Sequence, residues 1–551
     1  MVAKELAEEN AVLGKLRSGV TARTGEVLAD LVLIFLSAAL FSFAFPSIIS
    51  EWGWFPLAYV SLVPLFIVVH RSRWSTIWLY GLLYGFLTYS LLNYWLLNFH
   101  PLAIFIVPVI YAVYFAVLFP LLKLAETLFP RYGYLLQVGI WVAYEYLRLQ
   151  GFLGYAYGII GYSQYMVSPL VRLSSITGVW GVSALVVFPS AFLAAGIVEG
   201  RLTEFSRFAR AHRLEGIAYV AIVGVVLGYG WASRIDYSDA RSWRVGAVQQ
   251  NIDPWRGGIE AYRDSLAALV RQSDRALAAN PDIVVWSETS FVPAIEYHTR
   301  YRPNAETFEL VRELRTYLSL QRVPFVLGNS DARLSRNLDG SLERVDYNAV
   351  LLHEDQEFGQ TYRKLHLVPF TEHFPYESSF PWLHRLLVEN DTTFWEAGDD
   401  YTIFETDGVQ FATPICFEDT FGYLSREFVR RGADVIINLT NDGWSRSVPA
   451  QMQHMAMAVF RAAENQRSVV RSTNSGMTSV IDPNGQIVEL LDPFEEAFMI
   501  ADVPIYSSSV TFYTRYGNWA AWVALIGSAL ALLFGVMHRV LRGRIDSRDG
   551  F

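Results

Sequence analysis

The hydrophobic pattern divides the chain into a long apolar part, a mixed part and a short apolar end. Apolar segments of membrane-spanning length fill the first 235 residues, and one more lies near the C-terminus. Each is long enough, or nearly so, to cross a hydrocarbon core of ~30 Å at ~1.5 Å per residue. Buried helices of a globular protein rarely come seven in a row, so the pattern predicts a polytopic membrane bundle. The expected helices cover residues 28–46, 54–70, 76–98, 101–127, 134–150, 170–198, 215–233 and 518–538.

Lysine and arginine alternate between the short loops of this predicted bundle. They gather before the first span, in the second, fourth and sixth loops and in the C-terminal tail, whereas the first loop (46–54) and the third (around His100) have none. Because basic residues stay in the cytoplasm, eight spans with both termini cytoplasmic are expected, and the part between spans seven and eight lies outside. The basic positions are Lys4, Lys15, Arg17, Arg23, Arg71, Arg73, Lys123, Arg131, Arg201, Arg207, Arg210, Arg213, Arg539, Arg542, Arg544 and Arg548.

Residues 236–515 show short strand-like runs alternating with amphipathic helix patterns. This alternation predicts an α/β domain with packed layers, between membrane parts at 1–235 and 516–551. The expected strands are 244–250, 282–287, 323–328, 347–353, 409–416, 434–438, 468–472 and 477–481, and the expected helices are 258–279, 304–320, 419–431 and 449–466.

One segment of this middle part, Phe374–Val388, is rich in aromatic residues, prolines and leucines. Two interpretations are open. It is either a packed loop or an arm that touches lipid beside a functional site.

Composition supports the membrane assignment. The hydrophobic share of 52%, the aromatic share of 15% and a mean hydropathy of +0.25 are high for a soluble protein. The net charge of −9 and the lack of a basic patch in the middle of the chain argue against nucleic acid as a partner. A single cysteine rules out an intramolecular disulfide. The polar start leads into an apolar segment with no evident cleavage site, so no cleavable signal peptide is expected.

That single cysteine, Cys416, lies in the stretch ATPICFED (412–419), between an apolar β-forming run and a helix-compatible acidic run. A nucleophile at a strand-to-helix junction is rigid and exposed, with backbone N–H groups near a developing oxyanion. The thiolate is the reactive form, so the cysteine needs a base or a cation beside it. The alternative is an inert, buried cysteine.

Two other segments carry chemistry that suits a cysteine nucleophile. In VVWSET, Glu288 ends a buried-type strand, where burial raises the pKa of a carboxyl toward the range of a general base. In YRKLHLVPFTE, Lys364 can stabilise a thiolate and an oxyanion, and Glu372 can orient it. A solvated loop glutamate and a surface lysine are the alternatives. His366 and His373 lack a third ligand at metal spacing, so no metal is expected.

The order Glu288, Lys364, Cys416, in the contexts W-x-E-T, Y-x-K-x-H-L-V-P-F and P-x-C-x-E, resembles the nitrilase superfamily. Such a domain between seven spans and one more resembles the apolipoprotein N-acyltransferase family within it. Further motifs match along most of the chain: GYSQ (161–164), GVWGVS (178–183), VQQNI (248–252), NLTNDGW (438–444), QH (453–454), RAAE (461–464), RSTNSG (471–476) and IDPNG (481–485).

The chain departs from the family pattern at three places. Phe417 follows the cysteine where the family usually has tyrosine, so a hydroxyl is absent. Ala156 and Tyr157 stand where a Pro-Trp pair is usual, and Trp255 stands for a family tryptophan at a shorter local spacing.

The resemblance implies an αββα sandwich outside the cytoplasm of a bacterial inner membrane, and a reaction without a cofactor. Cys416 would take an acyl chain from a phospholipid, by family analogy phosphatidylethanolamine, as a thioester. Glu288 would be the general base and Lys364 the oxyanion stabiliser, supported by Glu372 and Glu418. The acceptor would be the α-amino group of a diacylglyceryl-cysteine at the N-terminus of an apolipoprotein. The alternatives are a membrane-anchored amidase of small amides, a lipid-binding scaffold with a decayed site, and a transporter.

Overall fold

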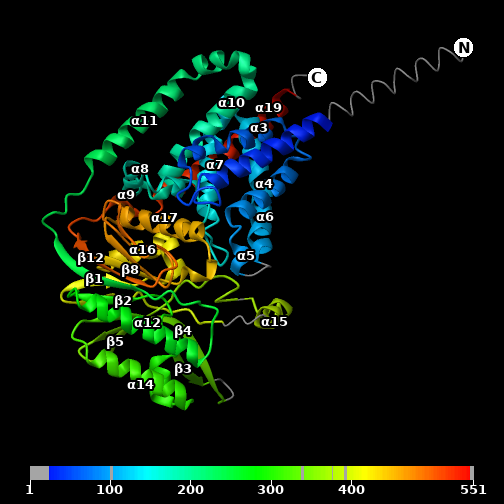
Figure 1. The fold of residues 1–551 in the computed structure, drawn as a ribbon. Coiled ribbons are helices and arrows are strands. Elements are labelled where there is room, and N and C mark those ends of the chain that lie inside the picture. Colours follow the sequence, from blue (N-terminus) through cyan, green and yellow to red (C-terminus); the bar gives the residue numbers. More distant parts are fainter. Residues whose placement is uncertain (1–23, 100–102, 337–339, 375, 390–393, 547–551) are drawn as a thin grey trace, which may run out of the picture.

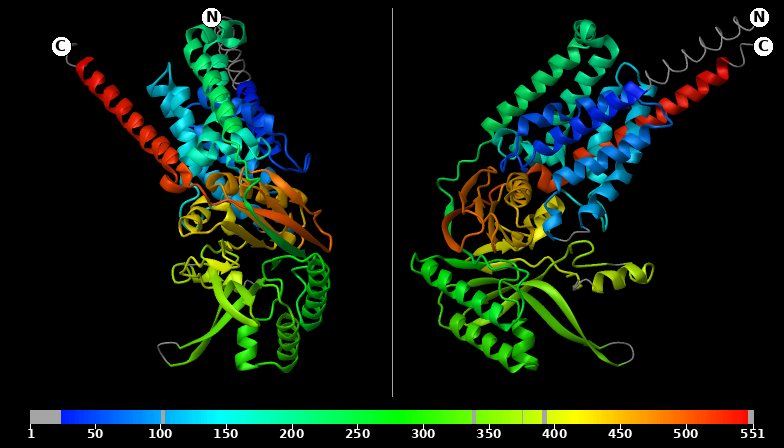
Figure 2. Two further views of the ribbon diagram at one scale, coloured as in Figure 1. Left: turned by 90° about the vertical axis from the view of Figure 1, so that its left-hand side faces the viewer. Right: turned by 45° about the vertical axis from the view of Figure 1, so that its right-hand side comes forward.

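The computed structural model describes residues 24–99, 103–336, 340–374, 376–389 and 394–546. A bundle of helices packs on top of a β-rich body, and the last helix, α19 (Trp519–Asp546), returns to the bundle (Figure 1). The start of the first described helix and the end of α19 lie at the same end of the bundle, remote from the sheets (Figure 2). The basic positions before residue 24, His100 and Arg548 lie outside the described residues.

Every apolar segment expected from the sequence is helical. Within the described residues, five helices are long and apolar enough to cross a membrane: Thr24–Phe43, Ile104–Leu128, Val179–Glu199, Arg213–Ala232 and Trp519–Arg542. The remaining apolar helices are shorter: η1 (Phe55–Leu57) with α2 (Ala58–Ser61) and α3 (Val63–Arg71), then α4 (Ile77–Leu92) and α7 (Gly133–Leu147). Because these helices are shorter than a typical membrane span, the number of eight crossings stays a prediction.

The segment expected at 170–198 is not one helix. It consists of α8 (Ser168–Arg172), α9 (Ser174–Thr177) and α10 (Val179–Ala211). Gly178 breaks it with φ of 64°, and a Cβ there would meet the Tyr513 ring at 2.8 Å. Because α10 runs on to Ala211, the basic residues expected in the sixth loop lie mostly on this helix, and α11 (Arg213–Ala232) begins two residues later.

Small residues bring two helices of the bundle into close contact. Gly81 and Gly85 of α4 lie against α6 (Ala103–Leu128), where an added Cβ would meet backbone oxygens of Phe115 and Tyr111 at 2.3 and 2.5 Å. Glycines four residues apart on one helix face allow such backbone approach in membrane helix pairs. The pair explains why the apolar pattern is interrupted there by glycine.

The β-rich body contains two six-stranded sheets. The first has the order β12-β1-β2-β3-β4-β5 and the second β11-β10-β9-β8-β7-β6. In each sheet three neighbouring strands are parallel, β1 to β3 and β7 to β9. The strands are β1 (Arg241–Gln249), β2 (Ile283–Trp286), β3 (Phe325–Arg336), β4 (Leu342–Glu354), β5 (Glu357–Arg363), β6 (Phe404–Thr406), β7 (Val409–Ala412), β8 (Val435–Thr440), β9 (Ser468–Thr473), β10 (Ser479–Ile481), β11 (Ile487–Leu490) and β12 (Ala497–Ile505).

Four layers result, as expected for an αββα sandwich. The sheets face each other across a core that includes Trp243, Val285 and Ile437. Helices α12 (Ile259–Leu277) and α14 (Ala305–Ser319) cover the first sheet. Helices α16 (Gly422–Arg430) and α17 (Val448–Asn465) form the fourth layer (Figure 1). The bundle in turn covers α17, because Met455 and Phe460 belong to one apolar core with bundle residues.

Several elements differ from the sequence expectation. The strand expected at 409–416 ends at Ala412, and the helix expected from 419 begins at Gly422, because Cys416–Thr420 form the 3-10 turn η3. The patterns also missed β5, β6, β11, β12 and α13 (Ile295–Tyr301). Short strands with mixed burial carry little periodic signal.

The aromatic segment Phe374–Val388 contains a helix, α15 (Pro381–Glu389), that projects from the body (Figure 1). Phe380 and Trp382 are 48% and 61% exposed. A packed loop is therefore the wrong interpretation for this part of the segment, and contact with lipid remains a prediction.

Candidate active site

The candidate site lies where loops after strands of both sheets meet. Glu288 comes two residues after β2, and Lys364 directly follows β5, both from the first sheet. Cys416 opens η3 after β7, and Asn441 follows β8, both from the second sheet. The stacking of the two sheets thus brings together residues that are far apart in the sequence.

The turn that carries the cysteine is fixed in an unusual conformation. Cys416 has φ of 49°, in the left-handed region that non-glycine residues rarely adopt. The Asn438 amide donates hydrogen bonds to the carbonyl oxygens of Pro414 (3.0 Å) and Cys416 (3.2 Å). Ile415 bridges to Leu439 of β8. Backbone strain held by its surroundings in this way is frequent at functional sites.

Lys364 is fully buried between two carboxylates. Its Nζ donates to Oε1 of Glu372 at 2.8 Å and to Oε1 of Glu288 at 3.4 Å. Burial alone would lower the pKa of Lys364, but Glu372 and Glu288 outweigh it and hold the pKa above its ordinary value. The side chain is therefore an ammonium at neutral pH.

Glu288 is held by two donors besides Lys364. Asn348 of β4 donates its side-chain amide to Oε1 at 2.7 Å, and the backbone N–H of Asn441 donates to Oε2 at 2.9 Å. The backbone at Glu288 can lie close to β3 because Gly328 has no side chain: a Cβ there would meet the Glu288 Cα at 2.6 Å. Sheet packing and hydrogen bonds together fix this carboxylate.

The charges of Glu288 and Lys364 both affect the pKa of the Cys416 thiol. Burial raises the pKa of Cys416 well above its usual value, Glu288 raises it further, and Lys364 lowers it. The resting site therefore holds a thiol, and a base must take its proton before it can act as a nucleophile. The arrangement suits proton transfer to Glu288.

Glu418 does not touch Lys364 directly. Its carboxylate accepts hydrogen bonds from backbone N–H groups of two segments. Leu365 (2.7 Å) and His366 (3.0 Å) follow Lys364, and Ile415 (2.7 Å) precedes Cys416. The Tyr362 hydroxyl adds two more contacts. Burial raises the pKa of Glu418 to about 7. Glu418 thus links the segment of Lys364 to the segment of Cys416, and its support of Lys364 or of the oxyanion environment stays a prediction.

Glu372 binds Lys364 through Oε1 at 2.8 Å, and its role in supporting the lysine stays a prediction. Its second oxygen accepts from the backbone N–H of Val368 at 2.8 Å, which fixes the loop that carries both residues. Phe417 packs its ring against Phe421 at 5.0 Å and His366 at 5.9 Å. Phe417 therefore packs among aromatic rings without the hydroxyl that a tyrosine would carry.

Trp255 contacts the bundle. It is 52% exposed, and its ring lies 5.6 Å from Phe99 of α5 (Leu96–Phe99). Phe99 in turn contacts Trp444, 5.3 Å away, at the edge of η4 (Asp442–Ser445). These rings line the junction of bundle and sheets. No contact of Trp255 with Glu288, Lys364 or Cys416 is seen among the described residues.

Sequence reasoning missed two groups that hold the carboxylates. Asn348 binds Glu288 through its side chain, and its carbonyl accepts from the Lys364 backbone at 2.8 Å. The available signal was a polar residue directly before the apolar run 349–352 of β4. The backbone N–H of Asn441 carries no signal in a sequence, because any residue supplies one.

Comparisons with known proteins agree with this architecture. The carbon-nitrogen hydrolase family matches residues 244–510, and the apolipoprotein N-acyltransferase N-terminal domain matches residues 37–192. The chain is 42% identical to apolipoprotein N-acyltransferase 1 of Treponema denticola, over 93% of this chain and 97% of that protein. It is 40% identical to apolipoprotein N-acyltransferase 1 of Treponema pallidum, over 94% and 97%. An amidase from Nesterenkonia sp. is similar in structure over 51% of this chain and 97% of that chain, at 17% identity and a TM-score of 0.35.

The fold and the site define a membrane-embedded protein with a carbon-nitrogen hydrolase domain. More particularly, the chain belongs to the apolipoprotein N-acyltransferase family.

Proposed function

We propose that this protein transfers an acyl chain from a phospholipid to the N-terminal amine of an apolipoprotein, through a thioester on Cys416. The observation that carries the proposal is the buried ammonium of Lys364, which binds the carboxylate of Glu288 while both charges act on the cysteine thiol. The family to which the chain belongs supports the same activity.

In the first half-reaction, Glu288 accepts the Cys416 proton and the thiolate attacks the ester carbonyl of the donor. The Lys364 ammonium and backbone N–H groups of the cysteine turn stabilise the tetrahedral oxyanion. The C–O bond breaks, Glu288 returns the proton to the leaving alkoxide, and lysophospholipid departs. A thioester remains on Cys416.

In the second half-reaction, the free amine attacks the thioester carbonyl and Glu288 takes one amine proton. The C–S bond breaks, an amide is released, and the proton from Glu288 restores the thiol. Donor and acceptor thus use the same base and the same oxyanion site in turn. The finer identities, phosphatidylethanolamine as donor and a diacylglyceryl-cysteine as acceptor, belong to this proposal.

The bundle gives the proposal a physical basis. Helices α11 and α19 expose large apolar side chains, including Val225 at 70% and Phe534 at 65%, as lipid-facing helices do. Moving an acyl chain from the bilayer into water costs ~0.8 kcal/mol per CH₂. The ester must therefore reach the cysteine while its chain stays in the membrane. A small-amide hydrolase has no such requirement.

We further propose the division 1–235, 236–515 and 516–551, with eight crossings and both termini in the cytoplasm of a bacterial inner membrane. The start of the first described helix and the end of α19 both lie on the side of the bundle opposite the sheets, which supports a catalytic domain on the periplasmic side (Figure 2). The ends of α11 and β12, at Ala232 and Ile505, lie near these boundaries.

The decisive experiment is intact-mass analysis of the purified protein after incubation with phosphatidylethanolamine, beside Cys416→Ala. The expected result is a mass increase of one acyl group, removed by hydroxylamine and absent in the variant. A diacylglyceryl peptide with a free amine should remove the adduct, and its acetylated form should not. Absence of an adduct, with Cys416 still alkylated by a small reagent, would overturn the proposal.

A further inference from the structure

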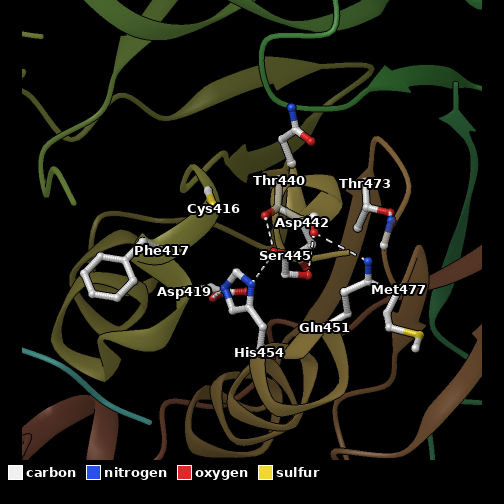
Figure 3. Close-up of polar contacts among 12 residues, drawn as sticks. Cys416, Phe417, Asp419, Thr440, Asp442, Ser445, Gln451, His454, Thr473 and Met477 are labelled. Carbon is white, nitrogen blue, oxygen red and sulfur yellow. Dashed lines mark hydrogen bonds and ion pairs between the residues drawn. The ribbon is translucent and has the colours of Figure 1, made fainter. Parts of the chain in front are cut away.

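A ring of four buried charged groups lies behind the cysteine turn. His454 of α17 contacts two carboxylates: its Nε2 lies 2.7 Å from Oδ1 of Asp419, and its Nδ1 lies 2.8 Å from Oδ1 of Asp442 (Figure 3). Arg471 of β9 pairs with the same two carboxylates, through Nη1 with Asp419 and through Nη2 with Asp442 at 3.2 Å. All four side chains are at most 3% exposed.

One of the two carboxylates belongs to the turn that carries Cys416, and the other belongs to the turn that binds Glu288. Asp419 lies on η3, three residues after Cys416. Asp442 opens η4, directly after Asn441, whose backbone N–H binds Glu288. The hydroxyl of Thr440 donates to Asp442 at 3.4 Å and also lowers the pKa of the Cys416 thiol. The ring therefore joins the nucleophile turn to the turn that holds the base.

The hydrogen bonds define the protonation state of His454. Each ring nitrogen faces a carboxylate oxygen, and only an imidazolium donates from both nitrogens. Burial would lower the pKa of His454, but Asp419 and Asp442 outweigh it and raise the pKa to about 9, with Arg471 opposing. The bundle contributes the Tyr157 ring, 6.4 Å from the imidazole.

The charge balance of the ring depends on this proton. Two carboxylates, one guanidinium and one imidazolium sum to zero, whereas a neutral group at position 454 leaves one uncompensated negative charge. Asp442 already raises the pKa of the Cys416 thiol through its charge. A net negative ring would disfavour the thiolate more strongly.

We propose that His454 is a positioning residue of the acyl-transfer site: as an imidazolium it neutralises the carboxylate pair behind Cys416 and fixes the nucleophile turn against the turn that holds Glu288. The proposal rests on the proposed function only in taking Cys416 and Glu288 as the reacting pair. It assigns a role to a buried histidine that takes no part in the proton transfers described above.

Cys416 is the only cysteine, so its alkylation reports directly on the thiolate. The experiment measures the rate of iodoacetamide addition against pH, by intact mass, on the full-length protein in detergent. H454Q removes one positive charge and is expected to raise the apparent pKa of the thiol by about one unit, a loss of about tenfold in rate below that pKa. D442N removes one negative charge and should lower the apparent pKa.

The double variant H454Q/D442N separates charge from structure. Both changes together restore the neutral ring, so its apparent pKa should return toward that of the parent protein. A role in structure alone predicts that the double variant is no better than the worse single one, and this result would overturn the proposal, as would shifts of the same sign in both single variants. If H454Q does not fold, the D442N variant alone tests the proposal. An apparent thiol pKa in D442N that equals or exceeds that of the parent protein would overturn it.

The two proposals fail separately. If no acyl adduct forms with phospholipid but the alkylation profiles shift as described, the proposed substrates are wrong and the role of His454 stands. If the adduct forms and the alkylation profiles of all three variants match the parent, the proposed role of His454 is wrong and the acyl transfer stands.

Discussion

The Nζ of Lys364 lies 3.4 Å from Oε1 of Glu288, and the two side chains are 0% and 7% exposed. This buried ion pair joins the proposed base to the proposed stabiliser of the oxyanion. Since Glu372 also binds Lys364, the ammonium keeps one carboxylate partner while Glu288 gains and loses its proton. The site can therefore pass through both half-reactions without leaving Lys364 unpaired.

Lys364→Met is expected to reduce acyl-adduct formation by about 10²–10³-fold, as loss of an oxyanion donor does in other enzymes. It also removes the charge that lowers the pKa of Cys416, so alkylation at neutral pH should slow. The measurements are the rate of adduct formation and the rate of iodoacetamide addition. Glu372→Gln is the matched control, since it keeps the ammonium beside Glu288 and should lose less activity. Adduct formation by Lys364→Met at the parent rate would contradict the assigned role.

Glu288→Gln tests the base. Glutamine keeps the size of the side chain, but it cannot take a proton. Its single carbonyl oxygen can accept from only one of Asn348 and Asn441, which bind different oxygens of Glu288. Loss of a general base typically reduces the rate about 10²–10⁴-fold. We expect that loss in single-turnover acylation, together with a lower thermal unfolding midpoint, because one buried donor loses its acceptor. A variant that is equally active above pH 8 would mean that another group accepts the proton.

The sequence predicted the layers of this fold because its signals are local. Apolar runs identified the helices of the bundle, and alternating strand and helix patterns identified the parallel strands β1 to β3 and β7 to β9. By contrast, β12 pairs with β1 in antiparallel register, Arg241 opposite Ile505, across almost the whole domain. No local sequence pattern shows which distant strand pairs with β1. The resemblance to a family implied a sandwich of two sheets but not this pairing.

The same limit applies to the site. Glu288, Lys364 and Cys416 could be picked out because reactive side chains stood in recognisable contexts. The groups that hold them could not, because Asn348 and the Asn441 N–H act through sheet stacking that only the folded chain shows. For Glu418 the sequence suggested support of Lys364 or of the oxyanion environment, but it did not show which groups the carboxylate binds: Tyr362, Leu365, His366 and Ile415.

Glu418→Gln is expected to abolish acylation and to destabilise the domain. Three backbone N–H groups point at the carboxylate, and a glutamine must turn its own amide N–H toward at least one of them. A buried donor left without an acceptor destabilises by about 1–3 kcal/mol. Tyr362→Phe is the control, because it removes a single hydroxyl donor and leaves the backbone links intact. Denaturant unfolding and adduct formation are measured together, and a milder effect for Glu418→Gln than for Tyr362→Phe would contradict this account.

The stability of the protein should depend on pH through His454. Its folded pKa of about 9 lies above the ordinary value of 6.5, so the native state binds the proton more tightly. The resulting stabilisation is complete below pH 6.5, where both states are protonated, and is lost as pH rises through 9. The difference in unfolding midpoint between the parent and His454→Gln should therefore shrink across that interval. A difference that is constant from pH 6 to 10 would contradict an imidazolium.

Gly328→Ala tests how precisely Glu288 must be placed. The new Cβ would lie 2.2 Å from the Ser287 carbonyl oxygen and 2.6 Å from the Glu288 Cα, both backbone atoms that cannot rotate away. The end of β2 must then shift relative to β3, and a displacement of a catalytic group by ~1 Å can reduce the rate about 10²-fold.

The control is Gly359→Ala in β5, where nothing lies within 4 Å of an added Cβ. It introduces the same methyl group into the same sheet and should leave acylation unchanged. Adduct formation and thermal unfolding are measured for both variants. Equal activity of the two would mean that the β2 end tolerates displacement, and that the close approach at Gly328 serves sheet packing rather than the position of the base.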